Sequence, residues 1–166
     1  MIENLAEATT AFSSNAFLVT GERVVLVDTG ANFDVVAEVR EHVDDLDAVV
    51  LTHTHPDHVG NLGAVRDAFD APVFAFDATL DGVDEAIEDG ETLAMGDDEY
   101  LAIHTPGHKQ DHLCFYAADP GTLFVGDLVF QGGSFGRTEL PGADRATLIE
   151  SIDRLLDLVD PDLEVF

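Results

Sequence analysis

The chain is poor in cysteine, and it also lacks long apolar runs and an apolar leader. Cys114 is the only cysteine among 166 residues, so an intrachain disulfide is impossible. This indicates a reducing compartment, and the apolar run Leu113–Ala117 around it predicts a core position. No run approaches the roughly 20 residues of a membrane-spanning helix. The start, with Glu3 and Glu7, is unlike a signal peptide. We therefore expect a cytoplasmic protein that does not enter a membrane.

Basic residues are scarce as well. Seven of them face 34 acidic residues, which gives a formal net charge of −27, and Lys109 is the only lysine. Such a chain repels nucleic acids and anionic membranes, so we expect neither as a partner. At molar salt the Debye length falls to about 3 Å, and the self-repulsion of the surface largely disappears. The acid is spread along the chain, which favours a cytosol of very high salt. The alternative is an acidic protein that binds a basic partner, for which block-like charge is more typical.

The hydrophobic content of 46% suits one globular core, so we expect a single domain over residues 1–166. Period-two and short apolar patterns predict strands at 15–20, 23–27, 48–51, 73–76, 91–94, 99–104, 112–117, 122–125 and 164–166. Helical spacing predicts helices at 34–42, 60–69 and 144–159, and a short helix within 78–88. A glycine-rich loop is expected at 132–142. Strand-rich pieces that alternate with a few helices indicate a layered α/β or α+β domain.

Three histidines and an aspartate fall within six residues, His53-Thr54-His55-Pro56-Asp57-His58, directly after the apolar run Ala48–Leu51. Imidazole and carboxylate together suit zinc, iron or manganese. Pro56 biases His55 away from helix, so we expect the motif on a loop at a strand end. Open α/β sheets place their sites at such strand ends. The alternative is a polar loop of scattered histidines that binds nothing.

Ligands clustered in one short segment do not complete the coordination of a metal by themselves. Catalytic zinc takes three or four protein ligands and a water. His108 follows the turn Pro106-Gly107, which can direct a side chain from a strand end. Asp127 ends an apolar strand, where a carboxylate is costly without a partner. We therefore expect His108 and Asp127 to be ligands, Asp127 as a bridge between two ions. We expect His112 in a supporting hydrogen bond and His42 on the surface.

The order of these pieces resembles the metallo-β-lactamase-fold hydrolases over almost the whole chain. The matching pieces are Asp28 after a hairpin strand, Thr52–Asn61, Thr105–His108 and Gly126-Asp127. The glyoxalase II-like (hydroxyacylglutathione hydrolase-like) branch, which hydrolyses thioesters such as S-lactoylglutathione, is similar also in Gly126–Phe130, Ser134–Thr138 and Leu140–Gly142. The resemblance implies an α+β fold, a four-layer αββα sandwich with a dinuclear site on one edge.

Carried over to this chain, the resemblance implies two divalent metal ions, zinc or else iron or manganese. His53, His55 and His108 would hold the first ion, Asp57 and His58 the second, and Asp127 would bridge them. The family's second site also takes a late histidine, on a loop that should begin where this chain ends, at Phe166. We therefore expect an incomplete second site and a sequence truncated at its C-terminus. We likewise expect the given sequence not to include the helical C-terminal domain of true glyoxalase II.

The family also differs from this chain just after His108. Lys109-Gln110-Asp111 stands where the family often has a threonine and a glycine. Such a change next to a ligand is expected to alter the residues that support the metal site.

The implied function is a metal-dependent hydrolase that cleaves a thioester or related acyl bond with a metal-bound hydroxide. Two ions lower the pKa of a shared water from about 16 toward 7. Asp57 is the expected catalytic residue, which orients this hydroxide or accepts a proton. Arg137, in the glycine-rich loop, is the candidate substrate-binding residue for a carboxylate of the thiol carrier. The alternative for Arg137 is a surface arginine paired with an acid.

Two rival functions fit the same residues. His53, His108 and Asp127 alone make the two-histidine, one-carboxylate set that suits non-haem iron. The mononuclear iron persulfide dioxygenases resemble the chain in this set and in the loop Gly136-Arg137-Thr138. The other rival is a catalytically silent acidic binding protein that keeps the fold.

Overall fold

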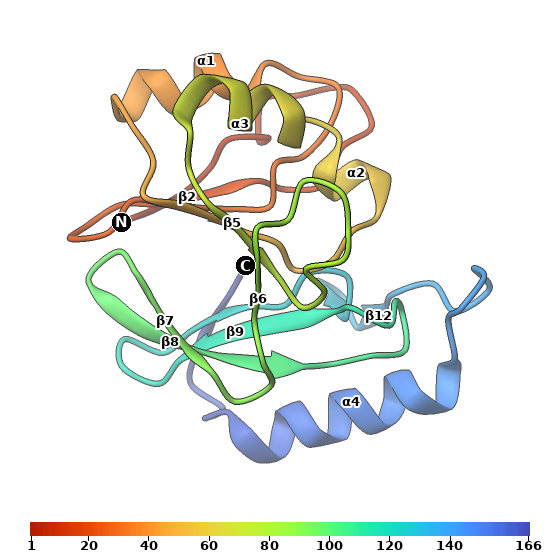
Figure 1. The fold of residues 1–166 in the computed structure, drawn as a ribbon. Coiled ribbons are helices and arrows are strands. Elements are labelled where there is room, and N and C mark those ends of the chain that lie inside the picture. Colours follow the sequence, from red (N-terminus) through yellow and green to blue (C-terminus); the bar gives the residue numbers. More distant parts are fainter.

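The computed structural model describes residues 1–166, which form four layers in the order helices, sheet, sheet, helix (Figure 1). The first sheet contains, in spatial order, β1 (Ile2–Asn4), β2 (Phe17–Val19), β3 (Val25–Val27), β4 (Ala48–Val50), β5 (Val73–Ala75) and β6 (Glu85–Ala86). The second contains β13 (Glu164–Val165), β10 (Thr122–Phe124), β9 (Leu113–Ala117), β8 (Asp98–His104) and β7 (Thr92–Met95). The outer layers are α1 (Val35–His42) and α3 (Leu62–Phe69) on one side and α4 (Arg145–Leu158) on the other. The αββα sandwich is confirmed.

The central strands are apolar on both faces because both faces are covered. In β3, Val25 and Val27 join the core between the two sheets, while Leu26 joins the core under α1 and α3. In β9, Phe115 faces the first sheet and Cys114 packs toward α4. Successive side chains of a strand point to opposite faces, so a strand between two cores becomes a continuous apolar run. Cys114 is fully buried, which confirms its predicted core position.

Two of the predicted helices begin at residues whose side chains cap them. Asp34 accepts a hydrogen bond from Ala37 N at 3.0 Å at the start of α1. Asp144 accepts one from Thr147 N at 2.8 Å at the start of α4. Each carboxylate satisfies a backbone N–H that has no partner within its helix. A membrane-crossing helix is absent from the fold, since even α4, with 14 residues, falls short of the required length.

Four local predictions need correction. The predicted helix within 78–88 is wrong: the segment forms turns and then β6, which pairs in parallel with β5. The predicted helix over 60–69 begins only at Leu62, and residues Pro56–Val59 form a separate helical turn, α2. The second half of the histidine motif is therefore helical rather than loop. The loop 132–142 contains β12 (Ser134–Phe135), paired with β11 (Val129–Phe130), and β1 was not predicted.

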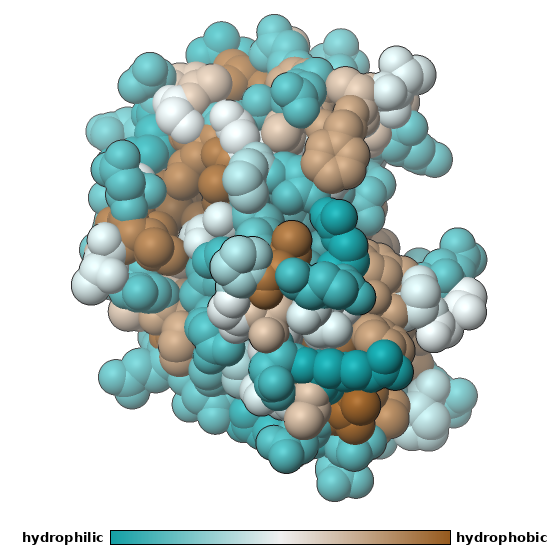
Figure 2. All heavy atoms as spheres, turned by 90° about the vertical axis from the view of Figure 1, so that its right-hand side faces the viewer, coloured by the Kyte–Doolittle hydropathy of each residue, from teal (hydrophilic) through white to brown (hydrophobic).

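Four strands of the sandwich end at the same edge and deliver their following residues there. β3 is followed by Asp28, β4 by the histidine motif, β8 by the turn before His108, and β10 by Gly126-Asp127. In the space-filling view of Figure 2, the right-hand border of the molecule is indented between an upper and a lower half.

Candidate metal centre

Three imidazole nitrogens from two separate loops face one point. His53 Nε2 lies 3.1 Å from His55 Nδ1, and His55 Nδ1 lies 2.8 Å from His108 Nε2. One donor atom of each of these residues and one carboxylate oxygen of Asp127 all lie within 4.8 Å of one another. The convergence expected from the sequence is therefore present for four of the six predicted ligands.

The hydrogen bonds behind the rings leave their inner nitrogens free to bind a metal. His108 Nδ1 donates to the carbonyl oxygen of Arg137 at 2.9 Å, so Nε2 carries the lone pair. The hydroxyl of Thr52 donates to Asp28 at 2.6 Å and so accepts from His53 Nδ1 at 3.1 Å. In metal sites, a hydrogen bond to the outer nitrogen of a histidine generally fixes the tautomer, so that the inner nitrogen can bind the metal.

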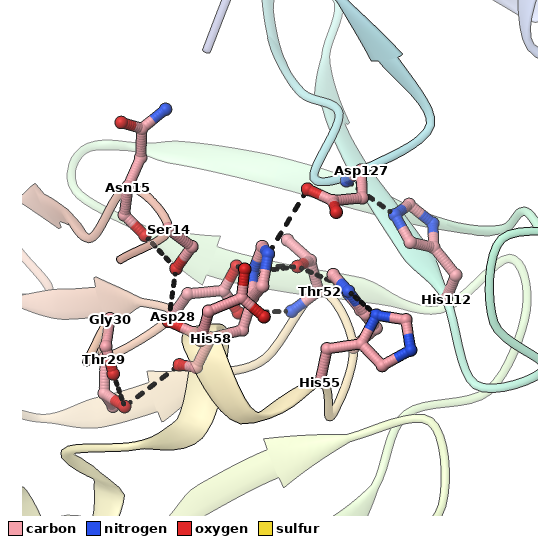
Figure 3. Close-up of polar contacts among 12 residues, drawn as sticks. Ser14, Asn15, Asp28, Thr29, Gly30, Thr52, His55, His58, His112 and Asp127 are labelled. Carbon is pink, nitrogen blue, oxygen red and sulfur yellow. Dashed lines mark hydrogen bonds and ion pairs between the residues drawn. The ribbon is translucent and has the colours of Figure 1, made fainter. Parts of the chain in front are cut away.

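His58 faces the same point from the other side. Its Nδ1 lies 2.7 Å from Asp28 Oδ2, and its Nε2 lies 3.3 Å from Asp127 Oδ1 (Figure 3). This Nε2 is buried and forms no hydrogen bond, although the Asp127 carboxylate lies near it. Asp28 is held in the left-handed region, with φ 57°, where its carboxylate also accepts from Thr52 N at 2.8 Å. A buried nitrogen without a partner is costly, and a cation in front of it removes that cost.

Asp127 stands between the two groups of histidines. Its second carboxylate oxygen lies 3.3 Å from His108 Nε2, opposite the oxygen that faces His58. Its backbone N–H donates to His112 Nε2 at 3.1 Å (Figure 3). His112 Nδ1 in turn lies 2.8 Å from Thr105 Oγ1. His112 is thus a supporting residue, as predicted. The two oxygens of Asp127 thus face different histidines, His58 and His108.

Two glycines permit the close approach of these segments. Gly126 has a φ of 49°, and a Cβ there would lie 2.7 Å from His112 Nε2. Gly107 has a φ of 130°, and a Cβ there would collide with the backbone of Leu148 in α4. The carbonyl of Gly107 also accepts from Asp144 N at 2.8 Å, so the start of α4 supports the turn that carries His108.

Burial and mutual repulsion keep most of these histidines neutral. Burial, and then the neighbouring His58, lower the pKa of His53 well below its ordinary value. Burial, and then His108, lower the pKa of His112 to about 3. Burial alone would lower the pKa of His58, but Asp28 and Asp127 raise it to about 10. Burial alone would raise the pKa of Asp127, but His58 and His108 hold it below its ordinary value. A metal that binds His58 therefore displaces a proton from it.

The residues present fit a divalent metal ion. Neutral imidazoles with a carboxylate are the donor set of zinc, iron and manganese sites. The unpartnered His58 Nε2 and the three converging nitrogens provide the geometric support.

The other predicted site residues lie near this centre. Asp57 is on the same helical turn as His58 and lines the adjoining cleft, outside the group of four converging residues. Arg137 contributes its carbonyl to His108, while its side chain is exposed at the cleft and forms no ion pair. His42 is on the surface as predicted, 2.6 Å from Glu3.

The sequence reasoning assigned no role to Asp28, although the structure places it under both Thr52 and His58. The signal that identified Asp127, a carboxylate directly after a buried apolar strand, applies equally to Asp28 after β3.

The cleft beside the metal centre has a volume of about 920 Å³. Apolar side chains, among them Phe12, Val129 and Phe130, line it together with the polar groups Asp57 and Arg137. It offers room for a small molecule with both an apolar and a charged part.

The match to known proteins agrees with this geometry. The model of the metallo-beta-lactamase superfamily matches residues 9–82 and 75–166, so the chain belongs to that superfamily. The chain is 37% identical over 128 residues to a hydroxyacylglutathione hydrolase of Klebsiella pneumoniae, which covers 74% of this chain and 50% of that enzyme. It is 30% identical over 177 residues to the hydroxyacylglutathione hydrolase GloC of Haemophilus influenzae, covering 91% of this chain and 83% of GloC. The solved structure of TTHA1623 in a di-iron-bound form superposes with a TM-score of 0.78 at 32% identity, covering 94% of this chain and 90% of that one.

The chain is therefore a metallo-beta-lactamase-fold protein of the metallo-hydrolase kind, with a histidine and aspartate cluster suited to divalent metal.

Proposed function

We propose that this protein hydrolyses a thioester or a related acyl bond with the help of two divalent metal ions. His53, His55 and His108 would hold the first ion, Asp57 and His58 would hold the second, and Asp127 would lie between them. The observation that carries the proposal is the convergence of three imidazole nitrogens and a carboxylate oxygen within 4.8 Å. Its resemblance to hydroxyacylglutathione hydrolases, at 30 to 37% identity, supports the acyl chemistry.

Bound divalent ions would supply an acidified water and would polarise the acyl group, whose carbon is the atom that the water attacks. The chain's own residues hold this centre in place: Asp28 and the Arg137 carbonyl orient His58 and His108 from behind. Asp57, on the cleft wall, accepts the proton released by the attacking water. A thiolate leaves readily, so the site needs no strong general acid beside the leaving sulfur.

Arg137 is the proposed anchor for a carboxylate of the thiol carrier. Arg137 lines the cleft, is exposed and forms no ion pair, although the chain carries 34 acidic residues. An arginine that keeps its charge free at a cleft is suited to bidentate binding of a carboxylate.

The test is a thioester assay with and without metal. Protein in molar salt is given S-lactoylglutathione, and the released thiol is measured. We expect hydrolysis that disappears after dialysis against a chelator and returns with zinc, manganese or iron. Hydrolysis that survives complete removal of metal contradicts the proposal.

The two rivals give different results in the same experiment. A mononuclear iron dioxygenase shows one iron per chain and oxygen uptake with a persulfide, and it leaves the thioester intact. A silent binding protein shows neither metal nor turnover.

A further inference from the structure

The only lysine of the chain joins the two loops that carry the metal ligands. Lys109 Nζ donates to Thr54 Oγ1 and, at 2.7 Å, to Asp111 Oδ1. Thr54 Oγ1 donates to Asp111 Oδ2 at 2.6 Å. The three side chains thus close a ring of hydrogen bonds between segments 55 residues apart in sequence.

Each member of this ring is attached to backbone that carries a site residue. Thr54 stands between His53 and His55 in the sequence, and Lys109 directly follows His108. Asp111 precedes His112, which accepts the backbone N–H of Asp127. A movement of the ring therefore displaces ligands on both loops, and second-layer groups of this kind usually set metal affinity.

The carboxylate of the ring is buried, unlike the carboxylates of the exposed ion pairs Arg66–Asp84 and Arg154–Asp89. Asp111 is 6% exposed and, with Asp28, one of only two buried acidic residues. Burial alone would raise the pKa of Asp111, but Lys109 and Thr54 hold it below its ordinary value, which favours the carboxylate form. An ammonium suits two acceptors on different loops because its three donors rotate freely, whereas the planar fork of arginine suits one carboxylate.

We propose that Lys109 is a positioning residue, whose ion pair with Asp111 and hydrogen bond to Thr54 hold His55 and His108 at the separation that a metal requires. The inference depends on the proposed metal site. Lys109 itself touches neither metal nor substrate in this account, and its effect passes through the backbone of the two loops.

The test compares metal affinity in three variants, all kept in molar salt. Lys109→Met removes the ammonium at similar length, Lys109→Met with Asp111→Leu removes both charges, and Arg66→Met is the matched control. Arg66 forms an exposed ion pair with Asp84 at 2.8 Å on the surface, so its loss changes the net charge equally. Zinc affinity is measured by chelator competition, and the absorption spectrum of bound cobalt(II) reports ligand geometry.

We expect zinc affinity to fall about 10- to 100-fold in Lys109→Met, with a changed cobalt spectrum, and to stay within about twofold in Arg66→Met. In Lys109→Met, the buried Asp111 carboxylate loses its partner, and this alone could destabilise the protein. The double variant removes that carboxylate as well, so any remaining loss of affinity comes from lost positioning of the ligands. We expect its melting temperature to recover toward that of the wild type while its affinity stays low. Wild-type affinity in Lys109→Met or in the double variant overturns the inference. A wild type that binds no metal instead overturns the proposed function.

Discussion

The metal-site edge and the remaining surface of this protein handle charge in opposite ways. At the edge, the two buried carboxylates, Asp28 and Asp111, each have a close partner, His58 at 2.7 Å and Lys109 at 2.7 Å. Elsewhere the other acidic residues are exposed or partly exposed. Few of them have a basic partner, because the chain has only seven basic residues. The buried charges at the edge are therefore stabilised by closely placed partners, whereas the charges of the remaining surface are screened by dissolved ions.

Lowering the salt should have the largest effect, because it acts on the whole surface. We propose that the protein is adapted to high salt. Between molar and millimolar salt the screening length grows from about 3 Å to 30 Å or more, so the acidic residues repel one another. We expect the melting temperature to fall by more than about 10 °C, roughly 3–5 kcal/mol for a chain of this size. A scan of melting temperature against potassium chloride measures it, and an unchanged value defeats the high-salt proposal.

Removing one ligand should abolish the function of the edge without touching the surface. We expect His53→Ala to lose metal binding and thioester hydrolysis entirely, because His53 contributes one of the converging nitrogens. His42→Ala is the matched control, since His42 is an exposed histidine on α1. Metal content and turnover are measured together. Activity retained in His53→Ala would falsify the ligand assignment.

Removing a residue behind the ligands should have an intermediate effect. Asp28→Asn takes away the charge that orients His58 and the acceptor for Thr52. We expect zinc affinity to fall about 10- to 100-fold and stability to fall by about 1–3 kcal/mol. Asp34→Asn is the control, because asparagine also caps a helix. Equal zinc affinity in the two variants contradicts a supporting role for Asp28.

Acid should weaken the metal-free edge specifically. His112 is buried with a pKa of about 3, against an ordinary value of 6.5, so its contribution to stability is complete above pH 6.5 and is lost as the pH falls toward 3. His58, with a pKa of about 10, contributes fully below pH 6.5 and loses its contribution only as the pH rises toward 10. In molar salt we therefore expect metal-free protein to lose about 2 kcal/mol between pH 6.5 and 4.5. Denaturant unfolding at each pH measures this, and a flat profile counts against it.

The smallest effect should come from Arg137, an exposed residue that serves the cleft. In Arg137→Gln we expect KM to rise about tenfold, or roughly 1.4 kcal/mol, for a thioester whose carrier bears a carboxylate. kcat should stay near the wild-type value, because the lost interaction is the same in ground and transition states. Arg40→Gln, on α1, is the control. A KM that stays constant argues for a surface role of Arg137.

Local sequence patterns predicted the parts of this molecule that local chemistry controls. The motif from His53 to His58 is contiguous, and the capped helices over 34–42 and 144–159 follow directly from their spacing. The strands were predictable because a short apolar run bounded by turn residues is typical of a buried strand.

Features that depend on residues far away in the sequence could not be predicted from local sequence patterns. The segment 78–88 has helical composition, but pairing with β5 makes part of it a strand. The links from Asp28 to His58 and from Lys109 to Thr54 join residues 30 and 55 positions apart, and no spacing rule connects them. The first contact forms when β3 and β4 pair, and the second when the two sheets stack, so the residues behind the ligands appear only in three dimensions.

Elemental analysis tests the central claim most directly, namely that loops from both sheets together bind divalent metal. Wild type and His53→Ala are purified side by side in molar salt without chelator, and zinc, iron and manganese are quantified per chain. The account predicts at least one ion per wild-type chain, with a second where the second site fills, and a clear loss in the variant. Wild-type protein that carries none of these metals, even after incubation with them, contradicts it.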